Sequence, residues 1–137
     1  MLERIYNIEK IIKPNKALII YGPRRVGKTT LLKAFLNKTK LKYKFDIGDN
    51  INIADILGSR DFKRIFEYAG GVELIAIDEA QLISGIGMGL KIIVDNLEKI
   101  FVVATGSSSF DLSQQIGEPL TGRKNTIILY PISQKEL

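Results

Sequence analysis

The sequence predicts an α/β fold of three layers, α/β/α, with about five mainly parallel strands. Short runs that are apolar almost throughout, such as residues 17–21 and 72–77, are typical of strands buried on both faces of a parallel sheet. Segments with the apolar spacing of helices separate these runs, as the crossovers of a parallel sheet require. The length of 137 residues fits one domain.

Five strands are expected along the chain. They cover residues 17–21, 43–46, 72–77, 101–105 and 126–130. Most are continuous apolar runs, but the second lies in a stretch, residues 38–46, that alternates lysine with apolar residues. This period of two predicts a strand with Leu41, Tyr43 and Phe45 inward. Pro131 ends the last strand.

Helices are expected between the strands. Residues 3–13 and 60–69 repeat apolar side chains at helical spacing, and Pro14 and Gly70-Gly71 end them. A further helix follows the first strand, and a short helical turn is expected within residues 49–59. The stretch Gly85-Ile86-Gly87-Met88-Gly89 is expected to be flexible, with a helix after it to about Leu97. Residues 107–121 are expected to be irregular.

The most informative motif follows the first strand and opens the next helix. It reads Gly22-Pro23-Arg24-Arg25-Val26-Gly27-Lys28-Thr29 and fits the phosphate-binding P-loop pattern Gly-x-x-x-x-Gly-Lys-Thr. Glycine allows the tight backbone whose N–H groups surround a phosphate, and the helix dipole favours the same anion. We expect Lys28 to bind the β- and γ-phosphates and Thr29 to bind Mg²⁺. The expected nucleotide-binding residues are Gly22, Pro23, Arg24, Arg25, Val26, Gly27, Lys28, Thr29 and Thr30.

Two adjacent carboxylates end the third strand, about fifty residues after the P-loop. In open parallel sheets, ligands bind outside the carboxyl ends of the strands. Asp78 is therefore expected to organise a Mg²⁺ ion, and Glu79 to orient or deprotonate a water that attacks the γ-phosphate.

Polar residues also flank the last two strands. Thr105, Ser107 and Ser108 follow an apolar run at the same expected edge, and any of the three hydroxyls could contact the γ-phosphate or its water. Arg123 precedes the last strand, and its guanidinium suits transition-state charge on a phosphoryl group of the same molecule or of a neighbour.

Composition excludes several kinds of chemistry. The chain has no cysteine and no histidine, which excludes disulfides, Cys/His zinc sites, thiol catalysis and histidine acid–base catalysis. A metal must then have oxygen ligands, which indicates Mg²⁺. We expect a cytoplasmic protein without membrane association, because no apolar run is long enough to span a bilayer and no signal pattern is present.

Charge is unevenly distributed. Residues 1–70 hold 15 Lys and Arg against 7 Asp and Glu, although the net charge of the whole chain is only +5. The alternating Lys38, Lys40, Lys42 and Lys44 could contact nucleic-acid phosphates, or they could form a solvated strand face that prevents edge pairing. The sequence leaves both interpretations open.

The motifs together resemble a known family. In chain order they are the P-loop at 22–30, Asp78-Glu79-Ala80-Gln81, Thr105-Gly106-Ser107-Ser108-Ser109, Gly122-Arg123, and Tyr130-Pro131-Ile132-Ser133-Gln134-Lys135-Glu136-Leu137. This order resembles the AAA-type ATPase domain of a large prokaryotic P-loop family, whose members usually carry a C-terminal domain of poorly defined function. The resemblance implies a P-loop NTPase fold in which residues 1–137 form the ATPase core, without a lid or C-terminal domain.

The resemblance also implies roles for single residues. Lys28 and Thr29 handle phosphate and Mg²⁺, Asp78 the metal and Glu79 the water, Ser107 or Ser108 senses the γ-phosphate, and Arg123 is an arginine finger. The implied activity is Mg²⁺-dependent hydrolysis of ATP to ADP, with a homo-oligomer if Arg123 acts between subunits. Two alternatives stay open: a nucleotide-binding switch with negligible turnover by itself, and a DNA-associated ATPase.

Overall fold

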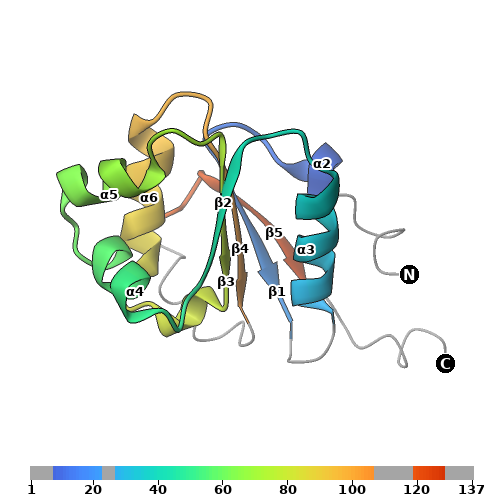
Figure 1. The fold of residues 1–137 in the computed structure, drawn as a ribbon, viewed down its shortest axis with the longest axis horizontal. Helices are drawn as coiled ribbons and strands as arrows, with labels where there is room; N and C mark the ends of the chain where they lie inside the picture. Colours follow the sequence, from blue (N-terminus) through green and yellow to red (C-terminus); the bar gives the residue numbers. More distant parts are fainter. Residues whose placement is uncertain (1–7, 23–26, 107–118, 129–137) are drawn as a thin grey trace, which may run out of the picture.

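The computed structural model describes residues 8–22, 27–106 and 119–128, and these form three layers (Figure 1). The elements are α2 (Ile8–Ile11), β1 (Ala17–Tyr21), α3 (Lys28–Lys38), β2 (Tyr43–Ile47), α4 (Ile51–Leu57), α5 (Phe62–Ala69), β3 (Leu74–Asp78), the 3₁₀ turn η1 (Ala80–Leu82), α6 (Ile86–Asn96), β4 (Phe101–Gly106) and β5 (Lys124–Ile128). No helix within the described ranges is long and apolar enough to cross a membrane.

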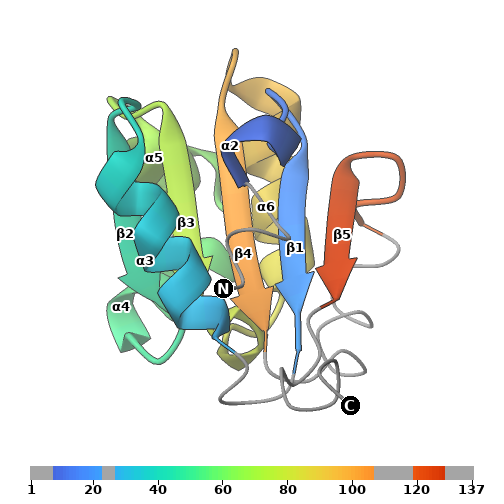
Figure 2. The same ribbon diagram turned by 90° about the vertical axis from the view of Figure 1, so that its right-hand side faces the viewer.

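The central layer is one sheet of five strands in the order β2-β3-β4-β1-β5, and every pair of neighbours is parallel. Helices α2 and α3 cover one face, and α4, α5 and α6 cover the other (Figures 1 and 2). The predicted three-layer fold with five parallel strands is therefore confirmed. Strand β1, which leads into the P-loop, lies between β4 and β5.

Alternation along the strands divides the core into two clusters. Ile75 and Ile77 of β3 pack with the α4–α6 layer, whereas Leu74 and Ala76 pack with α2 and α3. By the same alternation, the next position on the α3 face of β3 is Asp78. The parallel register aligns Ile77 with Ala104, so the strand positions that follow each of them, Asp78 and Thr105, are neighbours on the α3 side.

The second strand lies almost where it was predicted, over Tyr43–Ile47 rather than 43–46, but the alternation that begins at Lys38 does not belong to it. Helix α3 continues to Lys38, and β2 starts only at Tyr43. Since β2 is an edge strand, Tyr43 is 42% exposed rather than inward. The lysines do not form one strand face: the ammonium of Lys44 lies 4.3 Å from the centre of the Tyr68 ring and donates to the Tyr68 carbonyl at 3.0 Å.

The glycine-rich stretch predicted to be flexible is helical, so that prediction was wrong. Only Gly85 stands outside α6, as a left-handed residue (φ 78°) that precedes the helix. Gly89 lies inside it, where a Cβ atom would approach the Leu57 carbonyl oxygen to 2.2 Å. Glycine is needed there because α6 packs directly on the end of α4, a tertiary contact that no local pattern reveals.

Other boundaries moved by one or two residues, as helix and strand ends commonly do. β3 ends at Asp78 rather than at residue 77, and β5 runs over Lys124–Ile128 rather than 126–130. Of the predicted helix 3–13 the structure describes Ile8–Ile11 as helical, and most of the segment expected to be irregular, residues 107–118, lies outside the described residues.

Candidate functional site

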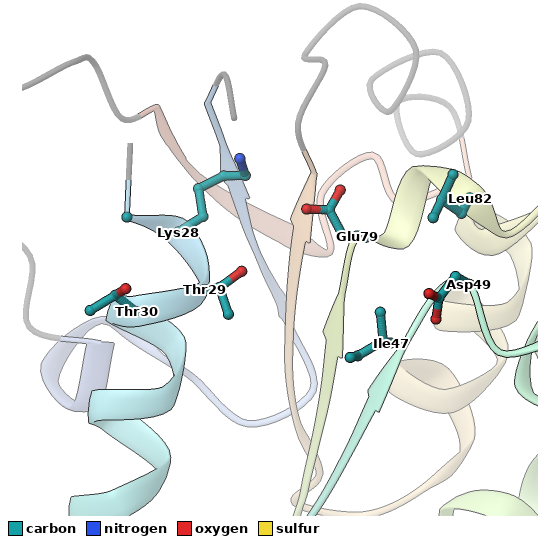
Figure 3. A pocket seen from close by; sticks show the side chains of 8 residues that line it. Lys28, Thr29, Thr30, Ile47, Asp49, Glu79 and Leu82 are labelled. Atoms are coloured by element: carbon teal, nitrogen blue, oxygen red, sulfur yellow. The ribbon is translucent and has the colours of Figure 1, made fainter. Parts of the chain in front are cut away.

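Strands β1, β3 and β4 end at the same edge of the sheet, and the start of α3 faces this edge. The amide of Gly22 donates to the Gly106 carbonyl at 3.2 Å, which joins the beginning of the P-loop to the end of β4. A cavity of about 530 Å³ opens between α3 and the ends of β2 and β3 (Figure 3). It is lined by Gly27, Lys28, Thr29, Thr30, Ile47, Asp49, Glu79 and Leu82.

The first turn of α3 forms one wall of the cavity. Gly27 has φ 92°, a left-handed conformation that glycine adopts at little cost, and α3 begins at the next residue. Helix N-terminal amides and the positive end of the helix dipole therefore face the cavity. Lys28 adds a cation there although its residue is only 4% exposed. Such a wall is suited to a polyanion.

Asp78 is held between two threonines. The Thr29 hydroxyl donates to Asp78 Oδ2 at 2.8 Å, and the Thr105 hydroxyl donates to Asp78 Oδ1 at 2.5 Å. Asp78 is 4% exposed and Thr105 is fully buried. A buried carboxylate requires such hydrogen bonds, and the two threonines fix its orientation beside the first turn of α3.

Glu79 adopts a strained backbone that turns its side chain toward α3. Its φ of 56° and ψ of 49° are left-handed, which is uncommon for a residue with a Cβ atom. The Glu79 amide donates to Thr105 Oγ1 at 3.0 Å, and Gly48 packs so closely that a Cβ atom there would approach the Glu79 carbonyl oxygen to 2.1 Å. The carboxylate points across the cavity toward Lys28 (Figure 3).

The arrangement fits a metal-bound polyphosphate better than a metal held by protein alone. Within the described ranges, no group of three or more Asp and Glu residues could hold an ion. The adjacent oxygens of Thr29 and Asp78 fit Mg²⁺, which protein sites often bind through one or two side chains together with substrate phosphates and water.

Among the hydroxyls left open by the sequence, Thr105 has a different position from the one expected. Its oxygen is buried and serves both Asp78 and the Glu79 amide, so it positions these residues and does not face the cavity. The alternation of side chains along β4, together with the register of β3 and β4, could have indicated that Thr105 lies beside Asp78. Ser107, Ser108 and the P-loop residues Pro23, Arg24, Arg25 and Val26 lie outside the described residues.

Arg123 lies at the opposite edge of the sheet from the cavity. It directly precedes β5, and its carbonyl accepts from the Ala17 amide at the start of β1, whereas the P-loop follows the end of β1. Five residues of strand, about 16 Å, separate the two edges. Its Nε donates to Asp95 Oδ1 at 2.5 Å. Contact with a phosphate bound in this cavity is thus excluded, and the expected contact with a phosphate of a neighbour stays a prediction.

Sequence reasoning missed several residues of the site. Asp49, Ile47 and Leu82 line the cavity, and the Gln81 amide donates to Glu79 Oε1 at 2.7 Å. Asp49 and Ile47 come from the end of β2, which could have been expected at this edge because all strands are parallel. Gln81 belongs to the motif Asp78-Glu79-Ala80-Gln81, but its contact with Glu79 depends on the conformation of Glu79 and was not expected.

Comparisons with known proteins identify the family of the chain. A family model described as an AAA domain matches residues 14–137. The uncharacterized protein MJ1544 of Methanocaldococcus jannaschii is 33% identical over 95% of the chain, and pachytene checkpoint protein 2 of Saccharomyces cerevisiae is 30% identical over 75%. The chain spans 30% and 20% of the lengths of these relatives.

Solved structures share the fold at low identity. A Walker-type ATPase of Pyrococcus abyssi has a TM-score of 0.60 and 20% identity over 84% of this chain and 49% of that one. Domain III of the replication initiation protein DnaA of Thermotoga maritima has a TM-score of 0.59 and 19% identity over 82% and 54%. A katanin structure that concerns self-assembly has a TM-score of 0.58 and 18% identity over 84% and 40%.

The family match covers residues 14–137, nearly the whole chain, and the observed fold is that of a solved Walker-type ATPase. This chain therefore belongs to the AAA domain family of P-loop ATPases.

Proposed function

We propose that this chain binds ATP and hydrolyses it to ADP and phosphate. The observation that carries the proposal is the common cavity of Lys28, Thr29 and Glu79, in which Thr29 also donates to the Asp78 carboxylate. A cationic helix N-terminus and a carboxylate base then face each other across a space of about 530 Å³. Phosphoryl transfer needs mainly positioned charge of this kind.

In this mechanism, the P-loop residues 22–30 bind the phosphates. Lys28 and the amides of the first turn of α3 stabilise the negative charge that develops on the β- and γ-oxygens. Glu79 orients a water molecule and accepts its proton. The water oxygen forms a bond to the γ-phosphorus while the bond from this phosphorus to the bridging oxygen of ADP breaks.

Thr29 and Asp78 would hold the Mg²⁺ ion, which supplies charge neutralisation to the phosphates when bound. The Thr29 hydroxyl and the Asp78 carboxylate already have fixed orientations, since Thr29 donates to one carboxylate oxygen of Asp78 and Thr105 donates to the other. In the proposal, Ser107 contacts the γ-phosphate from the end of β4.

The arginine of the reaction would come from a second copy of the chain. Arg123 cannot reach the cavity of its own molecule, and at 43% side-chain exposure it is accessible to another subunit. A neighbour that presents Arg123 would complete the charge around the γ-phosphate. One protein of similar fold, katanin, is described as self-assembling. We therefore propose a homo-oligomer as the active form.

The alternative of a DNA-associated ATPase has less support. Lys38 ends α3, Lys40 and Lys42 lie in the following loop, and Lys44 packs on Tyr68, so these four side chains do not form a single row. The similar fold of DnaA shows a shared architecture only.

The decisive experiment measures Mg²⁺-dependent ATP hydrolysis over a range of protein concentrations. We expect turnover per molecule to rise with concentration, to disappear in Glu79→Gln while ATP still binds, and to disappear in Lys28→Ala together with ATP binding. Normal turnover in Glu79→Gln would remove Glu79 from the mechanism, and unchanged ATP affinity in Lys28→Ala would refute the phosphate site. Nucleotide binding without turnover would indicate the switch module instead.

A further inference from the structure

Gln81 contacts the proposed base, Glu79, and has no role in the mechanism described so far. Its amide nitrogen lies 2.7 Å from Glu79 Oε1. An ionised carboxylate can only accept hydrogen bonds, so the Gln81 amide must present its NH₂ group to Glu79. We propose that Gln81 is a positioning residue that holds the Glu79 carboxylate in its productive orientation. This inference rests on the proposed ATPase function.

The backbone around this pair is held from several directions. The Glu79 amide is bound to Thr105 Oγ1, and the Glu79 carbonyl accepts from the Leu82 amide at 3.1 Å. Between them, the turn η1 is anchored by Ala80, which is fully buried, and by Ile83, also fully buried. Both ends of the Glu79–Gln81 hydrogen bond thus start from fixed backbone, so the bond selects a side-chain orientation rather than a backbone fold.

The remaining freedom lies in the side chain of Glu79. Glutamate has three rotatable bonds, and a partly exposed glutamate on a cavity wall would otherwise occupy several rotamers. The hydrogen bond from Gln81 occupies Oε1 and leaves the second oxygen to accept the proton of the attacking water. Orientation of a base in this way is part of what makes general-base catalysis efficient.

A neutral amide is well suited to this task. A lysine or arginine in place of Gln81 would stabilise the negative charge of Glu79 strongly and make the carboxylate a weaker base. The glutamine amide provides direction with much less change in charge. Gln81 thus differs in effect from Lys28, which lies across the cavity from Glu79 (Figure 3) and whose charge would bind the phosphates.

The test compares the isosteric variant Gln81→Met, which lacks the donor, with wild type in steady-state ATP hydrolysis and in ATP binding. We expect kcat to fall about tenfold, because a general base contributes 10²–10⁴-fold and only its orientation is lost. KM and the affinity for ATP should change less than about twofold, since Gln81 is not expected to contact the nucleotide. Gln81→Glu should lower kcat at least as much, because two carboxylates repel each other.

Two controls separate positioning from a general effect on folding. Asn37→Met removes an exposed amide on α3 far along the helix and should leave kcat unchanged. In the Glu79→Gln background, which keeps ATP binding, adding Gln81→Met should leave the affinity for ATP unchanged, because the fold of the site does not depend on Gln81.

The outcomes are distinguishable. Unchanged or increased kcat in Gln81→Met, with turnover that still depends on Glu79, overturns the role of Gln81 alone. A parallel loss of kcat and ATP affinity also overturns it, in favour of a structural role. A wild-type chain without Glu79-dependent turnover overturns the proposed function and this inference with it.

Discussion

Replacement of Thr105 by valine tests whether one buried hydroxyl joins the Asp78 carboxylate to the backbone amide of Glu79. Valine has nearly the same shape, so the change removes hydrogen bonds without creating a cavity. The bond to the Asp78 carboxylate contributes about 1.5–3 kcal/mol, and the Glu79 amide, left without its partner in a partly buried place, costs about 1 kcal/mol, the lower end of a range of about 1–3 kcal/mol. The lower ends of these ranges together give about 2.5 kcal/mol of lost unfolding free energy.

The assay is urea or thermal unfolding of the chain without nucleotide. For a domain of about this size, about 2.5 kcal/mol lowers Tm by roughly 8 °C. The matched control is Thr105→Ser, which keeps the hydroxyl and loses one methyl group, about 1 kcal/mol. If Thr105→Val unfolds at the same denaturant concentration as Thr105→Ser, the hydroxyl does not carry the connection between Asp78 and Glu79, and the reasoning is refuted.

Two other changes test the layers that support the site. Gly89→Ala should lower the unfolding free energy by about 2 kcal/mol in a denaturant titration, because its Cβ atom would approach the Leu57 carbonyl oxygen to 2.2 Å; an unchanged midpoint would contradict the close packing of α6 on α4. Tyr68→Phe should make stability less dependent on alkaline pH. Burial, and then the hydrogen bond from its hydroxyl to Asp46 and the charge of Asp46, raise the pKa of Tyr68 above its usual 10.0. The folded state therefore favours the neutral phenol, and this stabilisation is complete below pH 10 and is lost as the pH rises beyond it. Burial also raises the pKa of Tyr21, so the wild type and Tyr68→Phe should both lose stability between about pH 9 and about pH 11. The variant should lose less, because it lacks the Tyr68 phenol. Equal losses in the two proteins would contradict the prediction.

The sequence predicted the features that depend on local pattern. The apolar runs of β1, β3 and β4 were found because strands covered on both faces leave no room for polar residues. The P-loop pattern was recognisable because its spacing is fixed by the phosphate that it surrounds. Helix α5 was expected because residues 60–69 repeat apolar side chains at helical spacing, and the structure buries Ile65 and Ala69 of this helix.

Features that depend on contacts between distant segments were not predictable in the same way. Gly85–Gly89 reads locally as flexible, and only the packing of Gly89 on Leu57 explains its helix. The position of Tyr43 at the sheet edge required the strand order. The position of Arg123, by contrast, could have been predicted from the sequence. A residue just before a parallel strand lies at the amino edge of the sheet, and the P-loop lies at the carboxyl edge.

The strand order has a consequence for the timing of folding during synthesis. β1 carries the P-loop near the start of the chain, but its two partners in the sheet are β4, which ends at Gly106, and β5, which ends at Ile128. Pairings so distant in sequence require closure of long loops and form slowly. The ribosome must therefore release the chain as far as Gly106 before β1 can gain its first neighbour, and as far as Ile128 before it can gain the second. Until then the P-loop has no rigid strand behind it, so tight nucleotide binding marks the end of folding rather than its beginning.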